Sequence, residues 1–298
     1  MVLREEYPLG TREQLVARFP GRSWDAIKLH AQAMGLKQAR SSQVLADLSP
    51  LLADTPLAFY WAGFLAADAS FNPGYRLVLT LSAKDEEHLV RFRGLIRHRG
   101  EIQYDKDGQP LVTCQDRYYG RQLMEKFGLV PNKTEHPPDL KWLSGDLFTA
   151  FLIGFIDGDG CINRQTGRLD FAIRIKLHSS WLGTLSVLSR KLHEAAGVRP
   201  IAEPHPTAEG YALLNVTNRP VLRWLQIQAN ALGLPVLRRK WDRIDARKES
   251  RQESGRKNRD VVLALNLAGE TNAAIVAATG LRAGSVRQIL SRAKRRAN

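Results

Sequence analysis

Two stretches of the chain are almost wholly apolar, and each carries an aspartate near its end. "FYWAGFLAADASF" covers residues 59–71, and "FLIGFIDGDGCI" covers residues 151–162. Long runs of aromatic, aliphatic and small side chains without a polar face predict buried helices. Asp68 in the first stretch and Asp159 in the second occupy the same place in the pattern, 159 − 68 = 91 residues apart. The match indicates an internal repeat.

The hydrophobic pattern that follows each stretch also repeats. The first copy continues with an alternating strand, an amphipathic helix, two strand-like segments and a closing helix, at residues 76–82, 85–96, 101–105, 110–116 and 118–129. The second copy gives a strand, a helix, a strand and a closing helix, at residues 168–176, 181–197, 210–217 and 219–234. We therefore expect an α+β fold of two similar domains, 50–143 and 144–245, related by an approximate two-fold axis.

Short helices are predicted before the repeats, in residues 1–45. Thr11 and Gln14 form a capping-box pair, and Ser23 can begin a second helix. Two short helices around a tight turn resemble a Myb-like helix-turn-helix. The basic residues that we expect to contact DNA in such a module are Arg22 and Lys28. A small helical packing module fits the same segment equally well.

A second helical module is predicted after the repeats, in residues 259–298, beyond a charged linker at 246–258. Thr271 or Asn272 can begin one helix, and Gly280 can make the turn into the next. The segment resembles a helix-turn-helix whose last helix enters a major groove. The expected DNA contacts of this module are Arg282, Ser285 and Arg287. A helical dimerisation or packing module is the alternative.

Composition narrows the classes of partner. The 298 residues include 44 Lys and Arg against 30 Asp and Glu, a net charge of +14, which favours a polyanionic partner and above all nucleic acid. A basic surface kept for solubility is the alternative. Only two cysteines occur, so neither a zinc site nor a disulfide framework is indicated, and a reducing setting fits best. With no signal peptide and no apolar run near the roughly 18 residues of a membrane span, we expect a soluble, cytoplasmic protein with no membrane partner.

The two aspartates call for a chemical explanation, because an isolated charge in an apolar helix is costly. If the two helices pack side by side through their small residues, both carboxylates emerge at the same end and repel each other. The small residues are Ala62, Gly63, Ala66, Ala67, Gly154 and Gly158. A divalent cation would relieve the repulsion, and Mg²⁺ (or another such cation, Mn²⁺) suits a site of one or two carboxylates at helix C-termini. Such a site in a basic protein suggests phosphodiester hydrolysis. The alternative is a pair of acids that only cap or hydrogen-bond within the core.

"WAGFLAADA" at 61–69 and "LIGFIDGDG" at 152–160 resemble the two motifs of a single-chain LAGLIDADG homing endonuclease. The resemblance covers about residues 55–245 and implies two pseudo-two-fold related αββαββα domains. It also implies that Asp68 and Asp159 are catalytic and bind metal, with added metal contacts from the carbonyls of Ala67 and Gly158. Asp157 falls on an earlier acid of the motif that is usually not catalytic.

The resemblance extends to two further features, and the chain departs from the family's pattern in one. The family often places a basic residue near each scissile phosphate, and Lys133 and Lys240 correspond to these residues. Lysines that are merely solvated in loops would fit both positions equally well. The first motif departs from the pattern, with Ala66 and Ala69 where the second has Asp157 and Gly160. The family reads DNA with antiparallel sheets. Strand alternation places one set of polar residues on the face that would lie on DNA: Arg76, Thr80, Ser82, Arg168, Arg174 and Lys176. A solvated sheet face would show the same alternation.

The function that the resemblance implies is a sequence-specific, Mg²⁺-dependent DNA endonuclease. It would cut both strands of a long double-stranded target as a monomer. The alternative is a non-cleaving relative that keeps the fold as a binding platform, either a transcriptional regulator or an RNA maturase.

Overall fold

The computed structural model describes residues 2–8, 10–36, 46–72, 74–164, 171–245 and 251–297. The chain divides into two compact units. The first holds the described residues up to Asn163 and those from Phe171 to Asp245, and the second holds Arg164 and the described residues from Arg251 onward.

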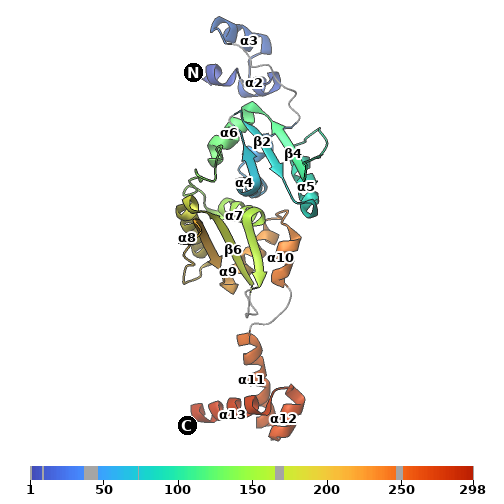
Figure 1. The fold of residues 1–298 in the computed structure, drawn as a ribbon, viewed down its shortest axis with the longest axis vertical. Coiled ribbons are helices and arrows are strands. Elements are labelled where there is room, and N and C mark those ends of the chain that lie inside the picture. The colour runs from blue at the N-terminus through green and yellow to red at the C-terminus, as the bar shows by residue number, and fades with distance from the viewer. Residues whose placement is uncertain are drawn as a thin grey trace. The chain divides into compact units, whose positions relative to one another are not determined.

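The first unit contains two copies of one αββαββα arrangement (Figure 1). The first copy consists of α4 (Pro56–Asp68), β1 (Ala69–Phe71), β2 (Arg76–Thr80), α5 (Glu86–Leu95), β3 (Gln103–Tyr104), β4 (Pro110–Gln115) and α6 (Arg117–Phe127). The second copy consists of α7 (Gly145–Asp159), β5 (Gly160–Arg164), β6 (Phe171–His178), α8 (Leu182–Ala196), β7 (His205–Pro206), β8 (Tyr211–Val216) and α9 (Arg219–Ala231). Three 3₁₀ turns accompany them, η1 (Ser49–Leu52), η2 (Ala83–Asp85) and η3 (Ser179–Trp181). The α+β class predicted from the sequence is confirmed.

Each copy forms one four-stranded sheet, with strand orders β1-β2-β4-β3 and β5-β6-β8-β7. The central pairs are antiparallel, and Val78 is opposite Thr113 in one sheet while Ile175 is opposite Leu214 in the other. The hydrophobic pattern alone does not predict β1 and β5, because both strands follow their helices without a polar break.

Strand alternation separates buried from solvent-facing residues as expected. Leu77 and Leu79 of β2 and Ile173 and Ile175 of β6 are at most 1% exposed, whereas Arg76 and the other predicted polar positions with described side chains are half-buried or exposed. Each sheet therefore has one apolar face that packs into the core, and the predicted polar positions lie on the opposite face, which is more exposed.

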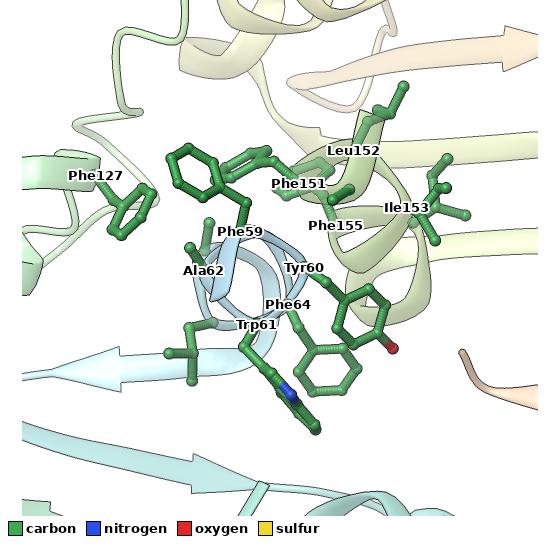
Figure 2. Packing of buried hydrophobic residues seen from close by; sticks show 14 of the residues in the cluster. Phe59, Tyr60, Trp61, Ala62, Phe64, Phe127, Phe151, Leu152, Ile153 and Phe155 are labelled. Atoms are coloured by element: carbon green, nitrogen blue, oxygen red, sulfur yellow. The ribbon is translucent and has the colours of Figure 1, made fainter. Parts of the chain in front are cut away.

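Helices α4 and α7 form the centre of the first unit. Figure 2 shows aromatic side chains of both helices clustered where the helices meet, with Phe59 of α4 next to Phe151 of α7 and Tyr60 directed away from them, beside Phe64. The helices touch backbone to backbone at two glycines. A Cβ atom on Gly63 would lie 1.9 Å from the Phe151 carbonyl oxygen. Glycine at these positions is what allows so close an approach.

Three helices precede the repeats, α1 (Val2–Glu6), α2 (Arg12–Arg18) and α3 (Trp24–Ala33). The capping box of Thr11 and Gln14 and the Ser23 cap are both present, as predicted. The helices enclose a small core, which consists of Tyr7, Leu15, Ile27 and Ala31. The Gln14 side chain also donates a hydrogen bond to the buried carboxylate of Asp116, at 3.1 Å, so these helices contact the first copy.

Two features differ from the expected organisation. Helix α10 (Arg238–Asp245) follows the second copy and was not predicted by the pattern. Helix α11 (Arg251–Leu267) begins within the expected linker 246–258, so the described part of that segment, from Arg251, is helical. The first turns of α11 are polar, and α10 spans only 8 residues, shorter than the stretch over which helical periodicity is recognised.

The second unit consists of α11, α12 (Asn272–Thr279) and α13 (Ala283–Ala297). Thr271 caps α12, and Gly280 ends it in the left-handed region with φ 66°. The helices surround Val262, Ile275 and Val286, each fully buried. Across the described ranges of both units, no helix is long and apolar enough to cross a membrane.

Candidate active site

The two motif aspartates are the last residues of the two central helices, Asp68 of α4 and Asp159 of α7. The helices are in close contact at this end too. A Cβ atom on Gly158 would lie 2.3 Å from the Ala67 Cβ and 3.3 Å from the Asp68 Oδ2. The Asp68 carboxylate therefore lies beside the residue that precedes Asp159, and the structure brings the two acids to one end of the helix pair.

The chain leaves both helices in the same conformation. Ala69 has φ −79° and ψ 149°, and Gly160 has φ −78° and ψ 142°. Each of their N–H groups donates to the carbonyl four residues earlier, of Leu65 or Ile156. The change from glycine to alanine between the motifs thus leaves the turn after the acid unchanged.

Burial disfavours the charged form of both carboxylates. The pKa of Asp68 is raised to about 6. Desolvation is the larger cause and the negative charge of Asp159 the second, although the residue itself reaches solvent. Desolvation likewise raises the pKa of Asp159, and the charges of Lys133 and Lys240 oppose that rise. A nearby cation would favour the charged form of both acids.

A lysine lies at the end of each helix. Lys133 Nζ donates to the carbonyl oxygens of Leu65 at 3.0 Å and Ala67 at 2.7 Å. Burial lowers the pKa of Lys133 to about 8, and the charges of Asp159 and Asp68 act against that decrease. The ammonium satisfies carbonyls that a helix C-terminus leaves without intrahelical partners, where positive charge is favoured.

Lys240 makes the equivalent contact with α7 and is more deeply held. Its ammonium donates to the carbonyls of Gly158 at 3.0 Å and Gly160 at 2.7 Å, and also to those of Ile156 and Asp157. The residue is 7% exposed. Burial lowers the pKa of Lys240, opposed first by the charge of Asp157.

These contacts involve the two carbonyls expected to contact metal. The Ala67 and Gly158 oxygens both accept hydrogen bonds from the lysines. A carbonyl oxygen has a second lone pair, so lysine contact leaves one acceptor position on each.

Asp157 has a part in the site that the sequence does not reveal. Its carboxylate is 1% exposed. Oδ2 accepts from the Tyr60 hydroxyl at 2.7 Å and the Leu237 N–H at 3.0 Å, and Oδ1 accepts from the Trp241 indole N–H at 2.6 Å. Burial raises the pKa of Asp157 to about 6 despite these hydrogen bonds, which favour its charged form. In the first motif the matching residue is the buried Ala66.

The network continues from Tyr60 to His88, whose Nε2 lies 3.0 Å from the Tyr60 hydroxyl. Burial, followed by the charge of Arg91, lowers the pKa of His88 to about 4, so the imidazole is neutral at pH 7. A neutral imidazole protonated on Nε2 can donate to the hydroxyl while the hydroxyl donates to Asp157.

Helix α10 carries an ion pair to the first copy. The Arg239 guanidinium donates from Nε and Nη2 to the two oxygens of Asp85, whose side chain is buried. Lys240 is the next residue in α10. Nothing local in the sequence indicates this pair, because its members are 154 residues apart.

The donor set fits a hard divalent cation. In the described ranges, no group of three or more His, Cys, Asp or Glu residues is placed to hold a metal. Asp68 and Asp159 are two carboxylates at one end of the helix pair, and burial raises the pKa of each. Mg²⁺ typically uses one or two carboxylates and completes its shell with water and phosphate oxygens.

The residues expected to contact DNA lie in several elements. Arg76 and Arg174 are exposed on β2 and β6, Thr80 is half-buried, and Ser82 is exposed just after β2. Lys176 is engaged within the protein, 2.5 Å from Glu209 Oε2 and above the Tyr211 ring. Arg168 lies outside the described residues. The remaining candidates are all exposed, and they are Arg22, Lys28, Arg282, Ser285 and Arg287.

No protein-family model matches the chain, and no curated protein matches it. Among solved structures, I-LtrWI, a LAGLIDADG homing endonuclease bound to target DNA, is 13% identical with a TM-score of 0.43, over 64% of this chain and 87% of the other. Mesophilic variants of the homing endonuclease I-DmoI are 17% identical with a TM-score of 0.44, over 64% and 98%. The meganuclease I-SmaMI, bound to uncleaveable DNA, is 12% identical with a TM-score of 0.40, over 60% and 86%.

Proposed function

We propose that this protein is a divalent-metal-dependent, sequence-specific DNA endonuclease of the LAGLIDADG type, which cuts both strands of its target. The observation that carries the proposal is the position of Asp68 and Asp159. The two acids end helices that pack backbone to backbone. A lysine holds the end of each helix.

In this proposal Asp68 and Asp159 hold the cation, with Mg²⁺ or Mn²⁺ as the best-suited ions. A bound divalent cation would supply Lewis-acid polarisation of the scissile phosphate and activation of water. The chain fixes where the two carboxylates stand, because both helix ends are locked by close packing. Lys133 and Lys240 add positive charge beside a reaction in which negative charge develops.

The two-fold repetition within one chain supplies two half-sites, one for each strand. A second chain is then unnecessary, and we expect the protein to act as a monomer. The domain scheme follows: residues 50–143 and 144–245 form the cleaving unit, flanked by helical modules at residues 1–45 and 259–298.

DNA binding in this proposal uses the polar strand residues and the flanking modules. A net charge of +14 favours a polyanionic partner. Both flanking modules have capped short helices around a tight turn, which supports helix-turn-helix units that extend the footprint on a long target.

One observation favours a second candidate, a binding protein without cleavage. Both lysine ammonium groups make their hydrogen bonds within the protein, as purely structural lysines would. A regulator or maturase that retained the fold would look similar at these positions.

The test uses a plasmid that carries the two DNA sequences flanking the protein's own gene. These flanks are joined directly, as they would be in DNA that lacks the gene. We expect linear product with Mg²⁺ or Mn²⁺ and none with EDTA. The same DNA without the joined site serves as the control. Tight binding to the joined site, with no cut in either metal, would favour the non-cleaving binder.

A further inference from the structure

The two halves of the site are held in unequal ways, although their helices repeat. Lys240 is 7% exposed and contacts four carbonyls around the end of α7. Lys133 is half-buried and contacts two carbonyls at the end of α4. The difference originates in what surrounds each lysine.

Lys240 is fixed from both sides along the chain by one buried carboxylate. Asp157 accepts from the Leu237 N–H, three residues before the lysine, and from the Trp241 indole, one residue after it. Between them, Arg239 is paired with the buried Asp85 of the first copy. The start of α10 is therefore tied at Leu237, Arg239 and Trp241, with Lys240 held among them.

Lys133 has no counterpart to this carboxylate. The first motif has Ala66 where the second has Asp157, and Ala66 cannot accept a hydrogen bond from its side chain. Lys133 lies in a turn whose described backbone hydrogen bonds run from Glu135 and His136 to Asn132.

We infer that Asp157 is a positioning residue for Lys240 and not for Lys133: by fixing the start of α10 it places the Lys240 ammonium against the end of α7. The inference rests on the proposed function, since it concerns which strand is cut efficiently. It follows that loss of the Asp157 carboxylate impairs one strand more than the other and makes the protein a biased nicking enzyme.

The substitution Asp157→Asn tests the positioning role, because it changes one of the three hydrogen bonds to the side chain and can keep the other two. The amide oxygen can still accept from Tyr60 and Leu237, but the amide NH₂ then faces the Trp241 N–H, donor against donor. Asp157→Asn/Trp241→Phe removes that conflict and should recover part of the lost function. Tyr60→Phe is the matched control, because it removes a donor to the same carboxylate from α4 and leaves the bonds of Asp157 to Leu237 and Trp241 in place. The longer contact of the Tyr60 hydroxyl to the Pro235 carbonyl, at 3.2 Å, is lost with it.

The experiment measures cleavage rates of both strands, each end-labelled, with the full-length protein in Mg²⁺. Lys133→Met and Lys240→Met serve as references for the two half-sites. We expect Asp157→Asn to slow one strand relative to the other on the order of tenfold, as loss of a supporting contact around a metal site commonly does. The slowed strand should be the one slowed by Lys240→Met. Asp157→Asn/Trp241→Phe should reduce the bias, and Tyr60→Phe should show none.

Hydrogen–deuterium exchange gives a readout independent of activity. We expect faster exchange over 237–241 in Asp157→Asn and no change over 131–136. If Asp157→Asn fails to fold, Trp241→Phe should show a smaller bias of the same sign. Equal slowing of both strands, or slowing of the strand that Lys133→Met affects, would overturn the inference and leave the nuclease proposal standing. A wild-type protein that cuts neither strand would overturn both.

Discussion

Gly154 on α7 lies directly against the main chain of Tyr60 on α4, so that a Cβ atom at Gly154 would be 1.9 Å from the Tyr60 carbonyl oxygen. Gly63 has the reciprocal relationship with Phe151. The spacing of the two helices is thus limited by backbone atoms and not by side chains. Asp68 and Asp159 owe their closeness to this contact, because each ends one of the two helices.

Gly154→Ala should separate the helices and destabilise the protein. The obstructing atom is backbone, which cannot rotate away, so we expect a loss of about 3 kcal/mol in the free energy of unfolding, the upper part of the range for overpacked cores. Urea denaturation measures it. Gly183→Ala is the control, since that helical glycine has nothing within 4 Å of its Cβ position and alanine there should be neutral or stabilising. A Gly154→Ala variant as stable as Gly183→Ala would contradict the packing described for α4 and α7.

Asp68→Asn should stabilise the metal-free protein at neutral pH. The folded pKa of Asp68 is about 6 against an ordinary value of 3.8, so the folded state binds the proton more tightly. The contribution of this group therefore falls as pH rises from about 4 to above 6. After discounting for the solvent exposure of Asp68, we expect a gain of about 1 kcal/mol at pH 8.

Urea denaturation in EDTA at pH 4.5 and pH 8 tests this sign. The difference in free energy of unfolding between Asp68→Asn and wild type should grow toward pH 8. A difference that is constant, or larger at low pH, would show that Asp68 is not strained by charge in the folded protein.

Cleavage should depend on pH with two limbs. Protonation of Asp68, with a pKa of about 6, opposes cation binding below that pH. Loss of the Lys133 charge, with a pKa of about 8, weakens the site above it. We expect kcat/KM in Mg²⁺ to be highest between these two pH values. Bound metal favours the charged acids and disfavours a neighbouring ammonium, so it should move both limbs toward lower pH. Lys133→Met should remove the alkaline limb while the acid limb stays, and an unchanged alkaline limb would exclude Lys133 as its source.

DNA binding should weaken steeply with salt if the C-terminal module contacts phosphates. Arg282 and Arg287 are both exposed in that module. Replacing either with Ala should reduce the slope of log K against log salt by about 1 if each arginine neutralises one phosphate. Fluorescence anisotropy with the target duplex measures the slope. Arg91→Ala, an exposed arginine that is paired with Glu87 on α5, is the control, and equal slopes for all three variants would remove the phosphate contacts from the account.

Local sequence patterns were sufficient for much of the fold. The repeated apolar stretches, the alternating strands, the Thr11 and Ser23 caps and the left-handed Gly128 at the end of α6 are all encoded within a few residues. The same patterns located Asp68 and Asp159, because an acid is conspicuous in an apolar helix.

Local patterns did not predict the residues that hold the site in place. Asp157 bonds to Tyr60 across 97 residues and to Trp241 across 84, and Asp85 pairs with Arg239 across 154. Side-chain partners so far apart leave no periodic signal in either segment. Helix α10 was not predicted because it spans only 8 residues, too few for its apolar positions Trp241 and Ile244 to be recognised as a helical repeat.

Asp68 and Asp159 are proposed to form one metal-dependent cleavage site together. Cleavage of the doubly end-labelled target in Mg²⁺ by wild type, Asp68→Asn and Asp159→Asn tests this, with DNA affinity measured for each protein in Ca²⁺. We expect that wild type cuts both strands, that each variant loses double-strand cleavage, and that both variants still bind the target. Double-strand cleavage by both variants at wild-type rates would contradict it.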